Sequence, residues 1–341
     1  MSLVAYEDAT QDAAGTIDEA KEWLAEVRRR APAELLTAIR AFSAGSGWVW
    51  GNLTPIVSQV PEPRDAAAVI GHVAAMDELE SKLHLLGHYL RPFRRETPPD
   101  VSRAAAQGDA DAAARLLATS FPDAPTWPDA LRALLALDPA ETKRRLVDIL
   151  RGWDEHVFRH HEARIRPILE RDAAMKRALA GLTSAQRLIE SATNGWDYVP
   201  EPGIERILLV PSVLLRPWVL TADHRELRIF CYAVADDALT EDGEPPARLV
   251  RQLRALADAR RLRLLKRLTA GPAPLHELAR EFGMPKTTLL HHLVLLRSAG
   301  LVRLHDTSER QYSPHAGYHL RAEVVGDVYR GLLAYLELPH V

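Results

Sequence analysis

The stretch from Leu253 to Tyr312 constrains the fold of this chain more than any other part of its sequence. It contains, in order, LRALADARRLRLLKRL, PLHELAREFGMPKTTLLHHLVLLRSAGLVRL and HDTSERQY. Three helical patterns are thus followed by two short strand patterns, LVRLH and RQYS, with a polar turn between them. This is the order of a winged helix-turn-helix, whose third helix enters a groove of double-stranded DNA. The sequence therefore predicts a DNA-binding segment here.

Local signals mark the ends of these helices. Asp258 can cap the first helix, because its carboxylate accepts a hydrogen bond from a free amide of the first turn. Gly283 supplies the turn before the third helix, and Pro285 can open that helix because its missing N–H is not needed there. The expected apolar face of the first helix consists of Leu262, Leu265 and Leu268.

The third helix is expected to divide into an inner and an outer face. Spacing of i, i+4 and i+7 directs three leucines to the core, namely Leu289, Leu293 and Leu296. The predicted DNA contacts are Lys286 at the start of the helix and, on its outer face, Thr287, Leu290, His291 and Val294. His292 is expected to be a packed side chain. In the wing, Arg303 and Arg310 suit contacts with the DNA backbone or minor groove.

Charge and composition agree with an intracellular nucleic-acid-binding protein. Residues Ala247–Ser313 carry 13 Lys/Arg against 5 Asp/Glu, whereas Met1–Thr240 carry 28 against 35. A localised positive surface is what phosphate contacts require. Cys231 is the single cysteine, so an internal disulfide is excluded. We expect no membrane span and no secretory signal, and hence a cytoplasmic protein. The heavy use of Ala, Arg and Leu suggests a GC-rich bacterial genome.

The fold class expected for the chain is mainly α with a small antiparallel β-sheet. Residues 1–240 form a mostly helical regulatory or dimerisation domain that ends in a β-meander at about 204–236, and residues 247–341 form the winged helix-turn-helix domain. The boundary is placed in the acidic, proline-bearing segment Leu239–Pro246. Helices are predicted at Ile17–Arg30, Ala33–Ala44, Asp65–Phe93, Asp129–Leu137, Pro139–Arg151, Trp153–Ala180, Ser184–Ala192 and Tyr318–Leu338. Strands are predicted at Glu205–Ser212, Val213–Thr221 and Glu226–Asp236, with Pro217 at an edge or bulge.

The segments ALADARRLRLLKRL and HELAREFGM, the following HHL and LRSAGLV, and Tyr312 resemble the ArsR/SmtB type of bacterial winged-helix regulator. LLVPS and GWDEHVFRHHEARIRPILE are similar to a long subgroup with an extra N-terminal helical domain. The resemblance implies a homodimer built from Ala247–Ala257 and Tyr318–Leu338. Pro285 and Leu290 depart from the usual pattern, which puts the operator sequence in doubt. The cysteines of metal-sensing members are missing, so we expect neither a metal nor a cofactor.

Signal sensing is expected in the region before residue 240, which holds all seven tryptophans. Trp48 and Trp50 flank a glycine-bearing break at Ser43–Asn52, and His72 and His161 fall on apolar helix stripes. These four are the candidate ligand-binding residues, for a small organic effector. The alternatives are a dimerisation or docking scaffold without effector, and a metal-responsive regulator that uses the i, i+4 pairs His84/His88 and His156/His160. No catalytic motif is found, so we expect no enzyme.

Overall fold

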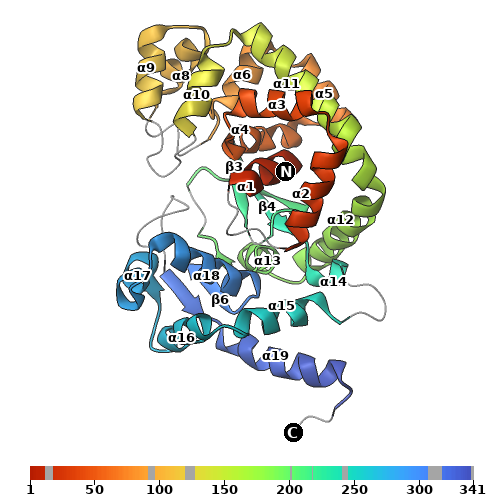
Figure 1. Cartoon of the computed structure of the whole chain (residues 1–341), viewed down its shortest axis with the longest axis vertical. Coiled ribbons are helices and arrows are strands. Elements are labelled where there is room, and N and C mark those ends of the chain that lie inside the picture. Colours follow the sequence, from red (N-terminus) through yellow and green to blue (C-terminus); the bar gives the residue numbers. More distant parts are fainter. Residues whose placement is uncertain are drawn as a thin grey trace. The chain divides into compact units, whose positions relative to one another are not determined.

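The computed structural model of the protein describes residues 1–11, 18–90, 97–119, 127–199, 202–216, 218–239, 245–305 and 317–338. Helices make up most of this part of the chain, and the strands form two small sheets (Figure 1). The predicted fold class is thereby confirmed. Contacts divide the chain into two compact units. The first comprises Met1–Arg164, Glu205–Leu208 and Thr221–Ile229, and the second comprises Ile165–Ile204, Leu209–Leu220 and Phe230–Val341.

The first unit is a helical assembly around one apolar core. Its helices are α1 (Ser2–Gln11), α2 (Asp18–Arg30), α3 (Ala33–Ser43), α4 (Gly47–Gly51), the 3-10 helix η1 (Thr54–Gln59), α5 (Ala66–Ala75), α6 (Glu78–Leu85), α8 (Pro99–Ala106), α9 (Ala110–Ala118), α10 (Trp127–Leu135), α11 (Pro139–Trp153), the π-helical segment η2 (Asp154–Phe158) and the start of α12 (Arg159–Ala180). Four of them are capped by an aspartate whose carboxylate accepts a hydrogen bond from a backbone amide of the first turn. These aspartates are Asp65, Asp77, Asp109 and Asp138.

The prediction of one long helix at Asp65–Phe93 is wrong, because the chain forms two helices there, α5 and α6. Met76 leaves the helical conformation with ψ 152°, and Asp77 then caps a new helix through the amide of Glu80. Residues of the predicted apolar stripe still enter the core, among them Val73 and Leu83. The stripe and the break are compatible because each short helix turns its own apolar face inward.

The predicted meander is a three-stranded sheet in the order β2–β4–β3, with residues in both units. Its strands are β2 (Arg206–Ser212), β3 (Leu220–His224) and β4 (Leu227–Ala233). The second strand is a correction, since it was expected at Val213–Thr221. Residues after Ser212 instead turn, with the amide of Leu214 donating to the Ser212 hydroxyl at 3.2 Å. Pro217 lies outside the described residues.

The second unit contains the rest of α12, α13 (Ala185–Ala192), α14 (Asp236–Leu239), α15 (Ala247–Leu256), α16 (Ala259–Leu268), α17 (Leu275–Phe282), α18 (Lys286–Ser298) and α19 (Ala322–Tyr335). Its sheet has the order β1–β6–β7–β5, formed by β1 (Trp196–Asp197), β5 (Ala273–Pro274), β6 (Val302–His305) and β7 (Gly317–Leu320). The β6–β7 and β5–β7 pairs are antiparallel, whereas β1 pairs with β6 in parallel, with Trp196 opposite Leu304.

One sequence prediction changes in this unit. The last helix was expected from Tyr318, but Gly317–Leu320 form strand β7 and α19 begins at Ala322. The strand expected at RQYS lies outside the described residues. The contact unit also reaches back to Ile165. A contact unit is not the same thing as a domain that folds alone, so the boundary at Leu239–Pro246 stays a prediction.

Among the described helices, none combines the length and the apolar character that a membrane crossing requires.

Candidate nucleic-acid interface

Helix α16 begins at Asp258, as expected. The Asp258 carboxylate accepts hydrogen bonds from the amides of Arg260 at 2.8 Å and Arg261 at 3.0 Å. These backbone bonds, that of Arg261 above all, lower the pKa of Asp258. The apolar face needs one correction, because Leu262 is exposed and the buried leucines are Leu264, Leu265 and Leu268.

An arginine holds α16 against α17. The guanidinium of Arg267 lies 2.8 Å from the carboxylate of Glu277 and 2.6 Å from that of Glu281. Helix α17 then ends at Gly283, whose φ of 60° is left-handed and favours glycine. Pro285 precedes the first residue of α18 and directs the chain into it. The tight turn between two helices that the sequence predicted is therefore present.

The faces of α18 largely match the expectation. Its three inner leucines, Leu289, Leu293 and Leu296, are fully buried. Lys286 and Thr287 are exposed, and Leu290 and His291 are half-buried. Val294 is a correction: only 5% of it is exposed, because it lies one turn further along, where the helix is enclosed by the rest of the unit. His292 is buried, and burial lowers the pKa of its imidazole, which agrees with a packed side chain.

The wing is described in part. Arg303 lies on β6 with 42% of its side chain exposed, and its guanidinium is 4.0 Å from the carboxylate of Glu190. Arg310 lies outside the described residues. The basic surplus of the sequence is partly consumed inside the protein, since Arg267 is already paired. Arg260, Arg280 and Lys286 are exposed and form no ion pair within the described residues, so they remain available to phosphate groups.

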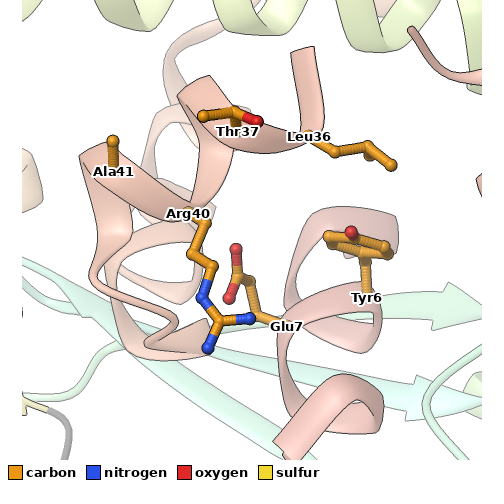
Figure 2. A pocket seen from close by; sticks show the side chains of 6 residues that line it. All are labelled: Tyr6, Glu7, Leu36, Thr37, Arg40 and Ala41. Carbon is orange, nitrogen blue, oxygen red and sulfur yellow. The ribbon is translucent and has the colours of Figure 1, made fainter. Parts of the chain in front are cut away.

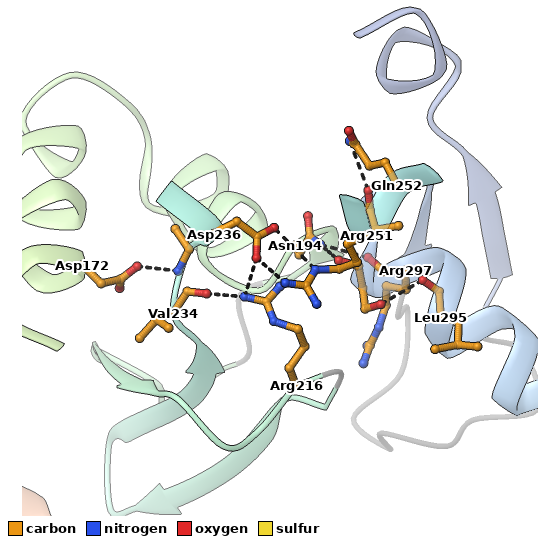
Figure 3. A network of polar contacts seen from close by, with 12 residues as sticks. Asp172, Asn194, Arg216, Val234, Asp236, Arg251, Gln252, Leu295 and Arg297 are labelled. Carbon is orange, nitrogen blue, oxygen red and sulfur yellow. Dashed lines mark hydrogen bonds and ion pairs between the residues drawn. The ribbon is translucent and has the colours of Figure 1, made fainter. Parts of the chain in front are cut away.

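The far end of α18 is supported by side chains that the sequence did not point to. The side-chain amide of Asn194 donates to the carbonyl of Arg297 at 3.0 Å and to that of Ser298 at 2.6 Å, and Gln252 donates to that of Ala299 at 3.4 Å (Figure 3). The last carbonyls of a helix have no partner within it, so these side chains satisfy them. The Asn-Gly pair at Asn194 was visible as a turn signal. Nothing in the sequence indicated which helix it would contact.

A second polar cluster lies at the start of α14. The carboxylate of Asp236 is 2.5 Å from Arg251 on α15 and 3.1 Å from Arg216, which also donates to the carbonyl of Val234 (Figure 3). Ala235 directly precedes Asp236 in the chain, and its amide donates a hydrogen bond to the carboxylate of Asp172 at 2.7 Å. Arg251 belongs to the basic segment of the sequence, yet its charge is used to join helices of this unit.

The four candidate effector residues do not meet at one site. Trp48 and Trp50 lie on the short helix α4 rather than beside a turn, and Trp50 is buried against Phe42, with ring centroids 5.7 Å apart. His161 is buried 3.8 Å from the carboxylate of Glu26, and burial lowers its pKa. His72 lines a cavity of about 290 Å³ in the first unit, and the other three candidates are not among the residues that line it.

Another pocket of the first unit has a volume of about 470 Å³ and is lined by Tyr6, Glu7, Leu36, Thr37, Arg40 and Ala41 (Figure 2). Its acid, Glu7, is buried and accepts a hydrogen bond from Ser43 at 3.0 Å. Burial raises the pKa of Glu7. Figure 2 shows the guanidinium of Arg40 reaching toward this carboxylate, so the two opposite charges of the pocket face each other.

Within the described residues, no group of three or more His, Cys, Asp and Glu side chains is arranged to hold a metal ion. The two histidines of the pair His84/His88 make different contacts. His88 shares a hydrogen bond of 2.6 Å with Ser102, whereas His84 lines the same cavity as His72. Cys231 is fully buried, and burial raises the pKa of its thiol to about 12. This thiol is therefore not a ready thiolate ligand.

Comparison with known proteins agrees with this geometry. A family model described as a helix-turn-helix domain matches residues 256–305, which run from the end of α15 to the end of β6. The HTH-type transcriptional regulator NmtR of Mycobacterium tuberculosis is 35% identical in an alignment over 89 residues, and this alignment covers 23% of this chain and 74% of the relative. No solved structure matches the chain. The family model therefore covers α16, α17, α18 and the first strand of the wing, β6.

Proposed function

This chain belongs to the ArsR family of helix-turn-helix transcriptional regulators, and we propose that it acts as a homodimer that reads a specific operator with helix α18. The observation that carries the proposal is the division of α18 into a buried leucine stripe and an exposed N-terminal end. That end presents Lys286 and Thr287, with His291 one turn further on. Residues in these positions of a recognition helix reach base edges, and a lysine can also meet phosphate.

The proposed dimer uses α15 and α19. These helices pack on one another within the unit, where Leu249 of α15 lies beside Gly331 of α19. Helix α19 also leaves apolar side chains exposed on one face, namely Val325, Tyr329 and, just after its end, Leu336. Spacing of i, i+4 and i+11 places them along one line of the helix. Such a stripe supports an interface between two copies of the chain.

Regulation is proposed to come from a small organic effector bound by the region before residue 240. An effector changes DNA binding only through its difference in affinity for the competent and incompetent states of the dimer. The alternative, a scaffold without effector, is favoured by the burial of Trp50 in the core of the first unit. The cavity beside His72 favours the effector. Because the partner is the chromosome, we expect the protein to work in the cytoplasm.

The test combines chromatin pull-down across the genome with binding to the recovered DNA by fluorescence anisotropy. We expect enrichment at a small set of promoters, the protein's own among them, and affinity for the recovered site at least 1,000-fold above random DNA, as is typical of specific regulators. Light scattering in solution should give the mass of two chains. Uniform recovery of the genome, or equal affinity for recovered and random DNA, would contradict sequence-specific regulation.

A further inference from the structure

The cavity beside His72 is built from aromatic and imidazole rings. The ring centroid of His84 on α6 lies 4.5 Å from that of Tyr89. It lies 6.0 Å from the ring centroid of His224 at the end of β3, and these two rings are stacked at an interplanar angle of 18°. The ring centroids of Tyr89 and His224 are 5.4 Å apart. All three side chains line the cavity. Faces and edges of such rings pack well against a flat ligand.

His84 contributes a buried imidazole to the wall of this cavity. Only 3% of His84 is exposed, and its Nδ1 has no hydrogen-bond partner among the described residues. Burial, reinforced by the neighbouring His224, lowers the pKa of His84 to about 4, so the ring is neutral near pH 7. Its Nε2 faces the amide nitrogen of Gln59 at 3.4 Å. Since an amide nitrogen only donates, Nε2 accepts and the ring proton lies on Nδ1.

The charges at the cavity favour a negative ligand. The carboxylate of Glu80 is already engaged, because it accepts the hydroxyl of Tyr89 and lies 3.2 Å from the guanidinium of Arg103. Arg225 also lines the cavity, is exposed, and takes part in no ion pair within the described residues. It occupies the two-residue turn between β3 and β4 with φ 55°, a conformation that is unusual for arginine. An exposed guanidinium at a cavity suits a carboxylate, which it can bind through two N–H groups.

We propose that this cavity binds a planar single-ring organic acid, with its carboxylate on Arg225 and its ring against the wall formed by His84, Tyr89 and His224. The volume of about 290 Å³ lies at the lower end of ligand cavities, about 300–1,000 Å³, and restricts the ligand to one ring with small substituents. The regulatory meaning of this site rests on the proposed control by an effector.

The test is calorimetric titration of the full chain with benzoate, salicylate and 4-hydroxybenzoate, each paired with its neutral amide. We expect at least one acid to bind and its amide to bind at least 10-fold more weakly. Arg225→Gln should weaken the acid by about 10- to 100-fold, the loss of one charge-assisted hydrogen bond. Arg115→Gln, which removes an exposed arginine of α9 in the same unit, should leave the affinity unchanged. His84→Phe replaces one ring of the cavity wall by a bulkier one and should also weaken the acid.

Several outcomes overturn the proposal: no acid binds, acid and amide bind alike, or Arg225→Gln and Arg115→Gln behave alike. The Arg225 and Arg115 variants keep the test valid even where His84→Phe fails to fold, because both positions are exposed. Operator affinity is measured separately with and without the acid. If the acid binds but operator affinity does not change, the site stands and its role as effector site fails. If operator binding is absent altogether, the proposed DNA function fails while the calorimetric result still decides the site.

Discussion

The side-chain amide of Asn194 lies 2.6 Å from the carbonyl oxygen of Ser298, at the end of the helix that we propose to read DNA. The two residues are 104 positions apart in the chain. The same amide also reaches the carbonyl of Arg297. Gly300 allows this approach, because a Cβ atom there would stand 3.0 Å from the Asn194 side-chain oxygen. The end of α18 is therefore held partly by a residue far outside this helix in the sequence.

Removal of this cap should loosen the end of α18. Asn194→Gly keeps the left-handed backbone at φ 56° but deletes both hydrogen bonds, and we expect a loss of about 1–2 kcal/mol in unfolding free energy. Asn194→Ala should lose about 1 kcal/mol more, because a Cβ atom disfavours that backbone conformation. Hydrogen exchange of the amides at residues 296–301 reads the local effect. Wild-type protection in Asn194→Ala would show that the cap contributes nothing.

Gly195 is expected to tolerate no side chain, for two reasons that a control separates. Its φ is 106°, and an added Cβ would lie 3.2 Å from the Cα and the Cβ atoms of Arg303. Gly108 has a similar φ of 99° with no atom within 4 Å, so Gly108→Ala meets the backbone strain alone. We expect Gly195→Ala to be more destabilising than Gly108→Ala by about 1–3 kcal/mol in urea unfolding, the range for overpacking. Equal effects would mean that the β1–β6 pair yields without cost.

The proposed base contacts and phosphate contacts should respond differently to substitution. Thr287→Ala and His291→Ala are expected to weaken operator binding by about 1–3 kcal/mol each while leaving random DNA nearly unaffected. Arg303→Ala should weaken both DNAs alike and reduce the slope of log affinity against log salt by about one. Anisotropy titrations at several salt concentrations measure both quantities. Equal loss on operator and random DNA for His291→Ala would contradict the proposed outer face.

Val294 provides the matched control on the same helix. Because it is buried, Val294→Ala should reduce the unfolding free energy by about 1–3 kcal/mol through the cavity it leaves. Its effect on the ratio of operator to random affinity should be small. A change in that ratio without a change in stability would restore Val294 to the contact surface.

The buried imidazole of His84 should make stability depend on pH. Its pKa is about 4 in the folded protein, lowered first by burial and next by His224, against about 6.5 when exposed. Unfolding therefore takes up a proton below pH 6.5, so the unfolding free energy falls as pH is lowered from about 6.5 to 4, by up to about 1.4 kcal/mol per pH unit. In His84→Gln this part of the dependence should vanish.

Urea unfolding between pH 7 and 5 measures the difference between the two profiles. The comparison must be made between wild type and variant, because burial also lowers the pKa values of His161 and His292 and both remain in the variant. Parallel profiles for the two proteins would show that His84 is not held neutral in the folded state.

Local patterns predicted the parts of the fold that depend on near neighbours. The leucine stripe of α18, the cap at Asp258 and the turn at Gly283 all follow from residues within a few positions of one another. The same reasoning failed at Met76, where one continuous apolar stripe hid a break between two helices. It also failed at Val294, because helical periodicity indicates which side faces the core but not how far the surrounding chain encloses it.

The residue pattern within each segment was sufficient to predict a helix-turn-helix in a basic part of the chain, because helix period, capping and turn residues are local properties. The packing of distant segments, in contrast, places Asn194 at the end of α18 and adds Trp196 as a parallel strand to the wing sheet. It also decided that His224 joins His84 around one cavity. Each of these relationships joins residues more than 100 positions apart, and a contact at that distance depends on how the segments pack rather than on the pattern inside either of them.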